Sequence, residues 1–438
     1  MFRHSSGPAG KAFLVLALGG QPHAAFGQSP DLAALGLAQA EQLLQARNRE
    51  LRAARRGVEA AQAITLSAGA RPNPMLSLGV AQINPSAGVG AGPFRDKTVD
   101  SSIRVDQVLE RGDRRELRVA TAKRLESAST EDLSDTYRQQ RLALRSAYYD
   151  LLFAQNKADI VQDNAILFQD STRAAELRLK AGDIAAADVS RLRVDALRAA
   201  NDARAADADR RRAQLALAYL IGAEAQAGAI RATDPWPEVI AVDVSSVTDE
   251  LIDRRADVRA ARNRVEAAQS ARELARSLRT RDVTVGAQFD HYPIGTGPNT
   301  NQFGSGNSYG VFLSVPLFAR YQFEGEIQRA EVDYNAALEA LEKVRALARA
   351  ELARSLSDLQ ATAERLRRYD QSLLPEAKKA ADSAEFAYKN GAIGVMDLLD
   401  SRRTQRAIQI DAASAHNDYA RALAAWQLGI GELGDERR

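Results

Sequence analysis

The sequence predicts a mostly helical protein with a smaller set of β-strands that contribute to a membrane β-barrel. Three observations lead to this fold class. The chain of 438 residues contains an internal repeat, long stretches have no Pro and few Gly, and four short segments alternate apolar and polar residues. The composition agrees, because 6% aromatic residues and an abundance of Ala, Leu and Arg suit long helices packed side by side.

Residues 1–27 are predicted to be a secretory signal peptide. Arg3 and Lys11 supply a positive start, residues 12–20 (AFLVLALGG) a short apolar core, and small residues lead to a cleavage point before Gln28. The alternative is a cytosolic N-terminus with a chance apolar run. Cleavage would remove two of 59 basic residues and none of 57 acidic ones, so the remaining chain is neutral. A neutral chain with scattered charges argues against nucleic acid as a partner.

The chain contains no Cys. This excludes disulfides, thiolate chemistry and Cys-ligated metals, and it excludes a lipid anchor on an acylated N-terminal Cys. No segment after residue 27 approaches the ~20 apolar residues that a spanning helix requires. If the protein enters a membrane, we therefore expect a closed β-barrel.

The repeat divides the chain into two copies of one unit. Val58-Glu-Ala-Ala-Gln62 recurs as Val265-Glu-Ala-Ala-Gln269, at an offset of 207 residues. Lys180-Ala-Gly-Asp-Ile184 matches Lys389-Asn-Gly-Ala-Ile393 at an offset of 209. An ordered series of matches at a nearly constant offset indicates a duplication. The predicted copies are residues 28–235 and 236–438.

Each copy is expected to run through a helix, a strand, a loop, a strand, a long helix, a turn and a second helix. The opening helices are predicted at residues 32–67 and 247–278. The strands are predicted at 74–83 and 98–109 in the first copy and at 282–291 and 308–318 in the second. The helical hairpins are predicted at 113–221 and 326–428. The links between paired strands, 84–98 and 291–307, are rich in Gly, Pro, Asn and Ser and read as exposed loops.

The predicted strands have one apolar and one polar face. Val99, Ile103, Val105 and Leu109 share the apolar face of the second strand, and the fourth carries apolar residues at alternate positions from 309 to 317. Such strands of about ten residues fit an outer-membrane barrel with its polar face toward the lumen. One face of a soluble sandwich is the alternative. The predicted lumen residues are Asp100, Arg104, Asp106, Thr284, Gln288 and Asp290.

The helical hairpins are predicted to be unusually long. No Pro occurs between Phe94 and Asp234, so a first helix over 113–181 would span about 100 Å at 1.5 Å per residue. Apolar residues follow heptad-like spacing along both hairpins. Helices of that length form a tube or rod. Pro375 is expected to kink the second hairpin near Gln371, with a short loop as the alternative.

Several motifs resemble those of the TolC family of outer-membrane efflux proteins. Asn73-Pro-Met-Leu-Ser-Leu78 opens the first strand as in family members, and residues 388–400 (YKNGAIGVMDLLD) look like the family's helix-tip motif. Leu179-Lys-Ala-Gly182 is similar to the tip of the first copy. Residues 108–118 (VLERGDRRELR) resemble the strand-to-helix junction of the cobalt–zinc–cadmium resistance branch.

The resemblance implies a homotrimer with a 12-stranded β-barrel in the outer membrane and a long α-helical barrel in the periplasm. Four strands per chain leave two open edges, so closure requires other chains. The implied partners are outer-membrane lipid, a periplasmic adaptor protein and an inner-membrane pump such as an RND transporter. The implied function is the exit duct of a heavy-metal or drug efflux system, without cofactor and not as an enzyme. The alternative is a periplasmic helical adaptor or structural protein that does not span the membrane.

The candidate site residues gather at the helix tips. Gly182, Asp183, Gly391 and Ala392 are expected to face the adaptor. Asp397 and Asp400 lie three residues apart on one helix face, and in a trimer they would form two rings of carboxylates that favour cations. Alternatively, they only complement the positive end of their helix. The resemblance also implies that Asp188 and Tyr388 match the Asp and Tyr that form the gate in family members. The Arg of that gate has no counterpart here, because Ile393 stands at its position.

The histidines after residue 27 are His291 and His416, and neither lies in a cluster in the sequence. A metal site is therefore not expected, even if metal ions are the cargo. No nucleophile–base motif and no phosphate-binding glycine loop occurs, so the sequence offers no candidate active site.

Overall fold

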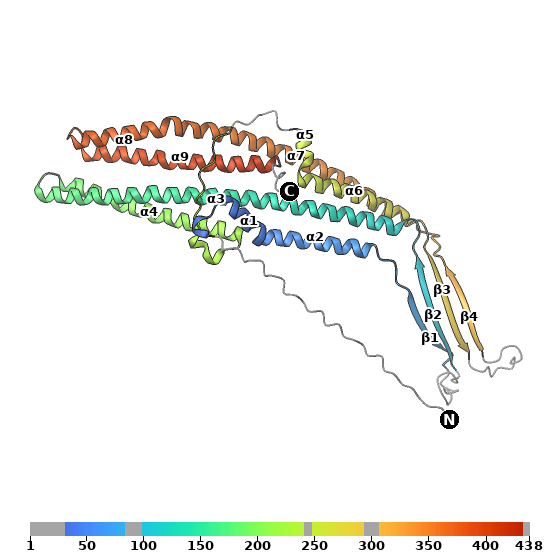
Figure 1. The fold of residues 1–438 in the computed structure, drawn as a ribbon. Coiled ribbons are helices and arrows are strands. Elements are labelled where there is room, and N and C mark those ends of the chain that lie inside the picture. Colours follow the sequence, from blue (N-terminus) through green and yellow to red (C-terminus); the bar gives the residue numbers. More distant parts are fainter. Residues whose placement is uncertain (1–30, 84–98, 241–247, 293–305, 432–438) are drawn as a thin grey trace, which may run out of the picture.

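The computed structural model describes residues 31–83, 99–240, 248–292 and 306–431. The predicted signal peptide and the loop 84–98 lie outside these ranges, as does most of the loop 291–307. Figure 1 shows an elongated molecule, with a four-stranded sheet at one end and two helical hairpins that reach their tips at the other.

Both halves of the chain run through the same order of elements. The first half contains a short 3-10 helix (Leu32–Ala34), α1 (Leu37–Arg47), α2 (Arg49–Ala68), β1 (Met75–Ala81), β2 (Asp100–Leu109), α3 (Arg114–Ala181), α4 (Ala186–Ile221) and a 3-10 segment (Glu224–Ala229). The second half contains α5 (Asp249–Arg254), α6 (Ala256–Ser277), β3 (Val283–Tyr292), β4 (Gly306–Ser314), α7 (Glu324–Arg368), a π-helical segment (Tyr369–Leu373), α8 (Leu374–Lys389) and α9 (Val395–Gly429). The origin of this order by duplication stays a prediction.

The predicted opening helices are not continuous, so the predictions of single helices over 32–67 and 247–278 were wrong. The first is divided into the 3-10 helix, α1 and α2, and the second into α5 and α6. Asn48 leaves the helical conformation, and its side-chain oxygen accepts the backbone N–H of Leu51 at 3.0 Å as an N-cap. In the second half the break falls at Arg255, which is also extended and lies 207 residues later. Both break residues are buried. Asn48 donates to the carbonyl of Leu220, and Arg255 pairs with Asp257 and with Glu351 of α7.

The four strands form one antiparallel sheet in the order β1-β2-β3-β4. The alternation is confirmed: the register places all six predicted lumen residues on one face. The opposite face is apolar and exposed, with Leu78 at 72%, Val311 at 84% and Leu313 at 71%. The fourth strand ends at Ser314 and not at residue 318, because Pro316 has no N–H to donate to a ladder.

Helix α3 lies at the centre of the helical part and contacts most of the other helices. It packs against α2 and α6 near the sheet and against α4 and α9 toward the tips (Figure 1). Near Gln371, where a kink was predicted, π-helical turns occupy Tyr369–Leu373, so the helix is distorted there and the alternative of a loop was wrong. A bend of the helix axis at this point stays a prediction. Pro375 explains the distortion, because it lacks the N–H that would bond the carbonyl of Gln371.

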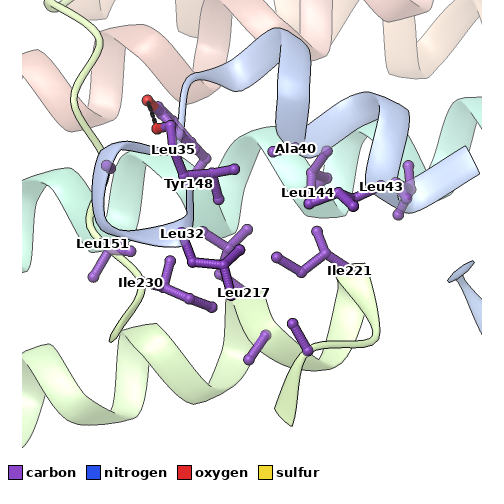
Figure 2. Packing of buried hydrophobic residues seen from close by; sticks show 14 of the residues in the cluster. Leu32, Leu35, Ala40, Leu43, Leu144, Tyr148, Leu151, Leu217, Ile221 and Ile230 are labelled. Carbon is purple, nitrogen blue, oxygen red and sulfur yellow. Dashed lines mark hydrogen bonds between the residues drawn. The ribbon is translucent and has the colours of Figure 1, made fainter. Parts of the chain in front are cut away.

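A cluster of buried apolar residues packs the middle of the first half together. Leu35 forms a parallel bridge with Ala232, so the first residues that the structure describes and the link between the halves lie side by side. Figure 2 shows Tyr148 of α3 pointing toward Leu35 within this cluster. The Tyr148 hydroxyl donates to the carbonyl of Leu35 at 3.0 Å and accepts the N–H groups of Thr233 and Asp234. Burial raises the pKa of Tyr148 to about 12.

We expect Tyr148→Phe to lower the free energy of unfolding by about 1–3 kcal/mol, because the hydroxyl's hydrogen bonds to backbone groups of Leu35, Thr233 and Asp234 are lost inside or beside the apolar cluster. Thermal or denaturant unfolding in detergent measures the change. The matched control is Tyr149→Phe, since no hydrogen bond to the Tyr149 hydroxyl occurs in the part of the chain that the structure describes. Equal losses in the two variants would contradict the role assigned to the Tyr148 hydroxyl.

Candidate functional site

Each helical hairpin reverses at a glycine with positive φ. Gly182 follows α3 with a φ of 84°, and the N–H of Asp183 donates to the carbonyl of Arg178 at 2.9 Å. Gly391 follows α8 with a φ of 72°, and the N–H of Ala392 donates to the carbonyl of Ala387 at 2.8 Å. A Cβ on either glycine would meet no atom within 4 Å, so backbone conformation and not space selects glycine here. Asp183 and Ala392 are exposed at these turns.

The two tips are joined by a small core and by charge pairs. Leu399 of α9 is buried with Phe168 of α3 and Leu192 of α4. Arg403 of α9 pairs with Asp195 of α4 at 2.5 Å and lies 5.6 Å from the centre of the Phe168 ring. These contacts tie the second hairpin to the first close to both turns.

Of the carboxylates singled out by the sequence, Asp188 and Asp397 lie in the first turns of the helices that leave the tips, and Asp400 lies one turn further along α9. In α9, Asp397 accepts the N–H of Gly394 at 3.3 Å, so it caps its helix. The Asp400 side chain is 81% exposed and lies 4.0 Å from Arg403. Asp188 of α4 occupies the position that Asp397 has in α9, and its carboxylate lies 3.9 Å from Arg191. Asp397 therefore caps its helix, whereas the Asp400 side chain is exposed at the surface of the single chain.

A basic partner for Tyr388 exists, although sequence reasoning found none. Arg178, in the last turn of α3, donates to the Tyr388 hydroxyl at 3.0 Å, and its guanidinium lies 5.8 Å from the centre of that ring. The contact bridges the two hairpins immediately before their turns. Ile393 does not supply this interaction. The only signal in the sequence was that Arg178 and Tyr388 each precede a tip glycine by three or four residues.

The polar face of the sheet forms a second group of candidate residues. Arg104 pairs with Asp106 at 2.9 Å along β2, and Gln288 donates to Asp290 at 2.7 Å along β3. Arg104 and Gln288 are direct partners in the register. Asp100 and Thr284 lie on the same face near opposite ends of the strands.

Within the described ranges, no helix is long and apolar enough to cross a membrane. No group of three or more His, Cys, Asp or Glu side chains comes together as a metal site among the same residues. His416 lies 3.2 Å from Asp370 and stacks on Trp236, with ring centres 5.6 Å apart.

A family model described as "outer membrane efflux protein" matches residues 40–223 and 247–432. The chain belongs to the outer membrane efflux protein family. Family members are transport channels rather than enzymes, and they are proteins of the outer membrane. The resemblance to the TolC family is thus confirmed, and the two matched stretches begin within α1 and just before α5.

Curated relatives of this outer membrane efflux protein include transport proteins of two kinds. The cobalt–zinc–cadmium resistance protein CzcC of Cupriavidus metallidurans is 26% identical over 325 residues, which cover 71% of this chain and 72% of the relative. The pyoverdine export outer membrane protein OpmQ of Pseudomonas aeruginosa is 30% identical over 208 residues, which cover 46% of this chain and 42% of the relative.

Solved structures share the fold of this outer membrane efflux protein. A membrane protein from Pseudomonas aeruginosa superposes with a TM-score of 0.73 at 20% identity, over 90% of this chain and 93% of that one. The outer membrane protein VceC of Vibrio cholerae gives a TM-score of 0.70 at 20% identity, over 90% and 96% of the two chains. At these identities the comparisons describe the fold alone.

Proposed function

We propose that the protein is the outer-membrane exit duct of a tripartite efflux system and acts as a homotrimer. The observation that carries the proposal is the sheet, which is polar on one face, apolar and exposed on the other, and open at both edge strands. An apolar face of this kind suits lipid, and open edges in lipid require pairing. Three chains of four strands give a closed 12-stranded barrel, with the polar face toward its lumen.

The edge helices support head-to-tail closure. On α2, Leu66 is 81% exposed, and on α7 Val332 and Leu347 are 59% and 57% exposed. Helix α2 leads to edge strand β1 and α7 follows edge strand β4, so these faces lie on opposite flanks of one chain. A heterologous interface of α2 with α7 of the next chain would cover both and close a ring. The helices would then form a long periplasmic barrel below the membrane.

The tips are proposed to meet a periplasmic adaptor and, through it, an inner-membrane pump such as an RND transporter. Gly182, Asp183, Gly391 and Ala392 would form the adaptor-facing turns. The exposed carboxylate of Asp400, with Asp397 and Asp188, would line the entrance. Tyr388, held by Arg178 of the neighbouring hairpin, would keep the two hairpins together in a closed state. The relation to CzcC favours divalent metal cations among the possible cargoes.

We expect the purified mature protein to be a trimer in detergent and to conduct ions in planar bilayers. Native mass spectrometry or light scattering gives the number of chains, and single-channel recording gives the conductance. The trimer is expected because a single four-stranded sheet cannot satisfy its edges in lipid. A stable folded monomer in lipid, or carbonate-extractable material without conductance, would contradict the proposal and favour a periplasmic adaptor or structural protein.

A further inference from the structure

Arg104 lies across the polar face of the sheet instead of standing out from it. Its guanidinium pairs with Asp106 on its own strand and stacks on Phe312 of β4, 4.5 Å from the ring centre. Strand β3 lies between β2 and β4, so the Arg104 side chain must cross β3 to reach Phe312. The side chains of Arg104 and Asp106 are only 33% and 13% exposed.

The crossing point on β3 is Gly286. The register aligns Asp106 with Gly286 and Gly286 with Phe312, while Arg104 is aligned with Gln288 in the next row. The diagonal from Arg104 to Phe312 therefore passes over Gly286. A Cβ at this position would lie 2.2 Å from Oδ1 of Asp106 and 3.4 Å from Nη2 of Arg104. The space that the glycine leaves is filled by the ion pair.

Glycine within a strand interior usually marks a bulge, a bend or a close backbone approach. None of these explains Gly286, because the pairing of β2, β3 and β4 is continuous through it and its near contacts are side-chain atoms. Phe312 completes the arrangement from the other side. Its ring leans over Gly310, where a Cβ would lie 2.9 Å from a ring carbon.

We propose that Gly286 is a positioning residue that holds Arg104 flat against the duct wall, so that the lumen presents a compensated pair and not a projecting cation. This inference rests on the proposed function, because the polar face is the lumen only if the sheet closes into a barrel. In a trimer, three projecting guanidinium groups would form a ring that repels cations. Pairing with Asp106 and stacking on Phe312 keep that charge out of the passage.

The test is single-channel recording of Gly286→Ala in a salt gradient. We expect its cation-to-anion permeability ratio to fall about threefold and its conductance to decrease, because the new methyl group displaces the Asp106 carboxylate and releases Arg104. The fold should survive, since the displaced atoms are side-chain ends. The matched control is Gly79→Ala on the same face, whose Cβ would lie 2.5 Å from the Ser102 hydroxyl, a neutral group. Gly79→Ala should behave as wild type.

A second pair of variants assigns the effect to Arg104. In an Arg104→Gln background, adding Gly286→Ala should leave the permeability ratio unchanged, because no guanidinium remains to be released. Two outcomes would show that the proposal is wrong while the proposed function stands. Either Gly286→Ala still lowers the permeability ratio in the Arg104→Gln background, or the wild type conducts and Gly286→Ala has the same permeability ratio as Gly79→Ala. Absence of wild-type conductance would instead contradict the proposed function, and the proposal with it.

A further variant keeps the proposal falsifiable if Gly286→Ala does not assemble. The double variant Arg104→Gln with Asp106→Asn removes both charges of the pair. Because the pair is compensated in the wild type, we expect the double variant to keep the wild-type reversal potential. A clear shift of the reversal potential in either direction would show that Arg104 or Asp106 acts alone on passing ions and would overturn the proposal.

Discussion

Replacing Asp397 and Asp400 together by Ala is expected to lower the cation-to-anion permeability ratio of the duct about fivefold. In water, two unit charges in contact interact by about 1 kcal/mol, and a charge that is farther away interacts more weakly. Six carboxylates around an entrance are therefore expected to stabilise a cation there by on the order of 1 kcal/mol. That energy corresponds to about a fivefold change in the ratio. The loss of stability should be small, because acids near a helix start contribute about 0.3–1 kcal/mol each.

The Asn variant of the same pair separates charge from capping. Asp397 caps α9 through the N–H of Gly394, and an Asn at 397 retains an acceptor for that bond while it removes the charge. We therefore expect Asp397→Asn with Asp400→Asn to lose selectivity as fully as the Ala variant and to keep the wild-type melting temperature. Planar-bilayer reversal potentials and block by multivalent cations measure selectivity. Unchanged values in both variants would mean that the carboxylates only stabilise their helix.

Much of the fold could be predicted because its features repeat with simple periods. Alternation along the strands fixed which face of the sheet is polar, and the observed register places Arg104 and Gln288 side by side on it. The tip turns were predictable at Gly182 and Gly391, because the positive φ that commonly ends a long helix favours glycine. The same reasoning located the distortion before Pro375.

The contacts between segments far apart in the chain could not be predicted. Arg178 and Tyr388 are 210 residues apart, and only the packing of α3 beside the second hairpin brings them together. Gly286 was part of the alternating run that indicated β3, but its importance depends on which residue lies diagonally opposite on another strand. Sequence periodicity gives the face of a residue, whereas its neighbours across strands depend on register.

The breaks at Asn48 and Arg255 were missed for a related reason. An Asn or Arg within a helical pattern is unremarkable unless its side chain is buried, and burial depends on tertiary packing. Asn48 donates to the carbonyl of Leu220, at the end of α4. Arg255 binds Glu351 in the middle of α7 at 2.8 Å. Both interactions hold an opening helix against a hairpin helix, which the sequence of either element alone does not show.

The Arg255 cluster leads to the largest expected loss of stability. Arg255 is 5% exposed, binds Asp257 through two nitrogens at 2.7 and 3.1 Å, and also binds Glu351. Arg255→Met keeps much of the volume but leaves the mostly buried carboxylate of Asp257 without its cation. We expect the variant to lose about 3 kcal/mol of unfolding free energy. The matched control is Arg254→Met, because Arg254 pairs with Glu250 at the exposed surface and should cost less than about 0.5 kcal/mol.

The dependence on pH tests the cause of that loss. Burial acts to raise the pKa of Asp257, but its hydrogen bonds and charge attraction with Arg255 outweigh burial, so the pKa is lowered below its ordinary value. A carboxyl with a lowered folded-state pKa contributes stability above its unfolded pKa of about 3.9 and loses it as the pH falls through the folded value. The difference in unfolding free energy between wild type and Arg255→Met should therefore be full at pH 7 and shrink in acid as Asp257 takes up a proton. The decrease should begin with proton uptake in the variant, where burial acts on Asp257 without Arg255, and end as the pH falls through the lowered folded-state pKa of Asp257 in the wild type. Melting curves of both proteins and of Arg254→Met across this range measure it. A gap that stays constant in acid would mean that Arg255 acts through packing of its alkyl chain and not through its charge.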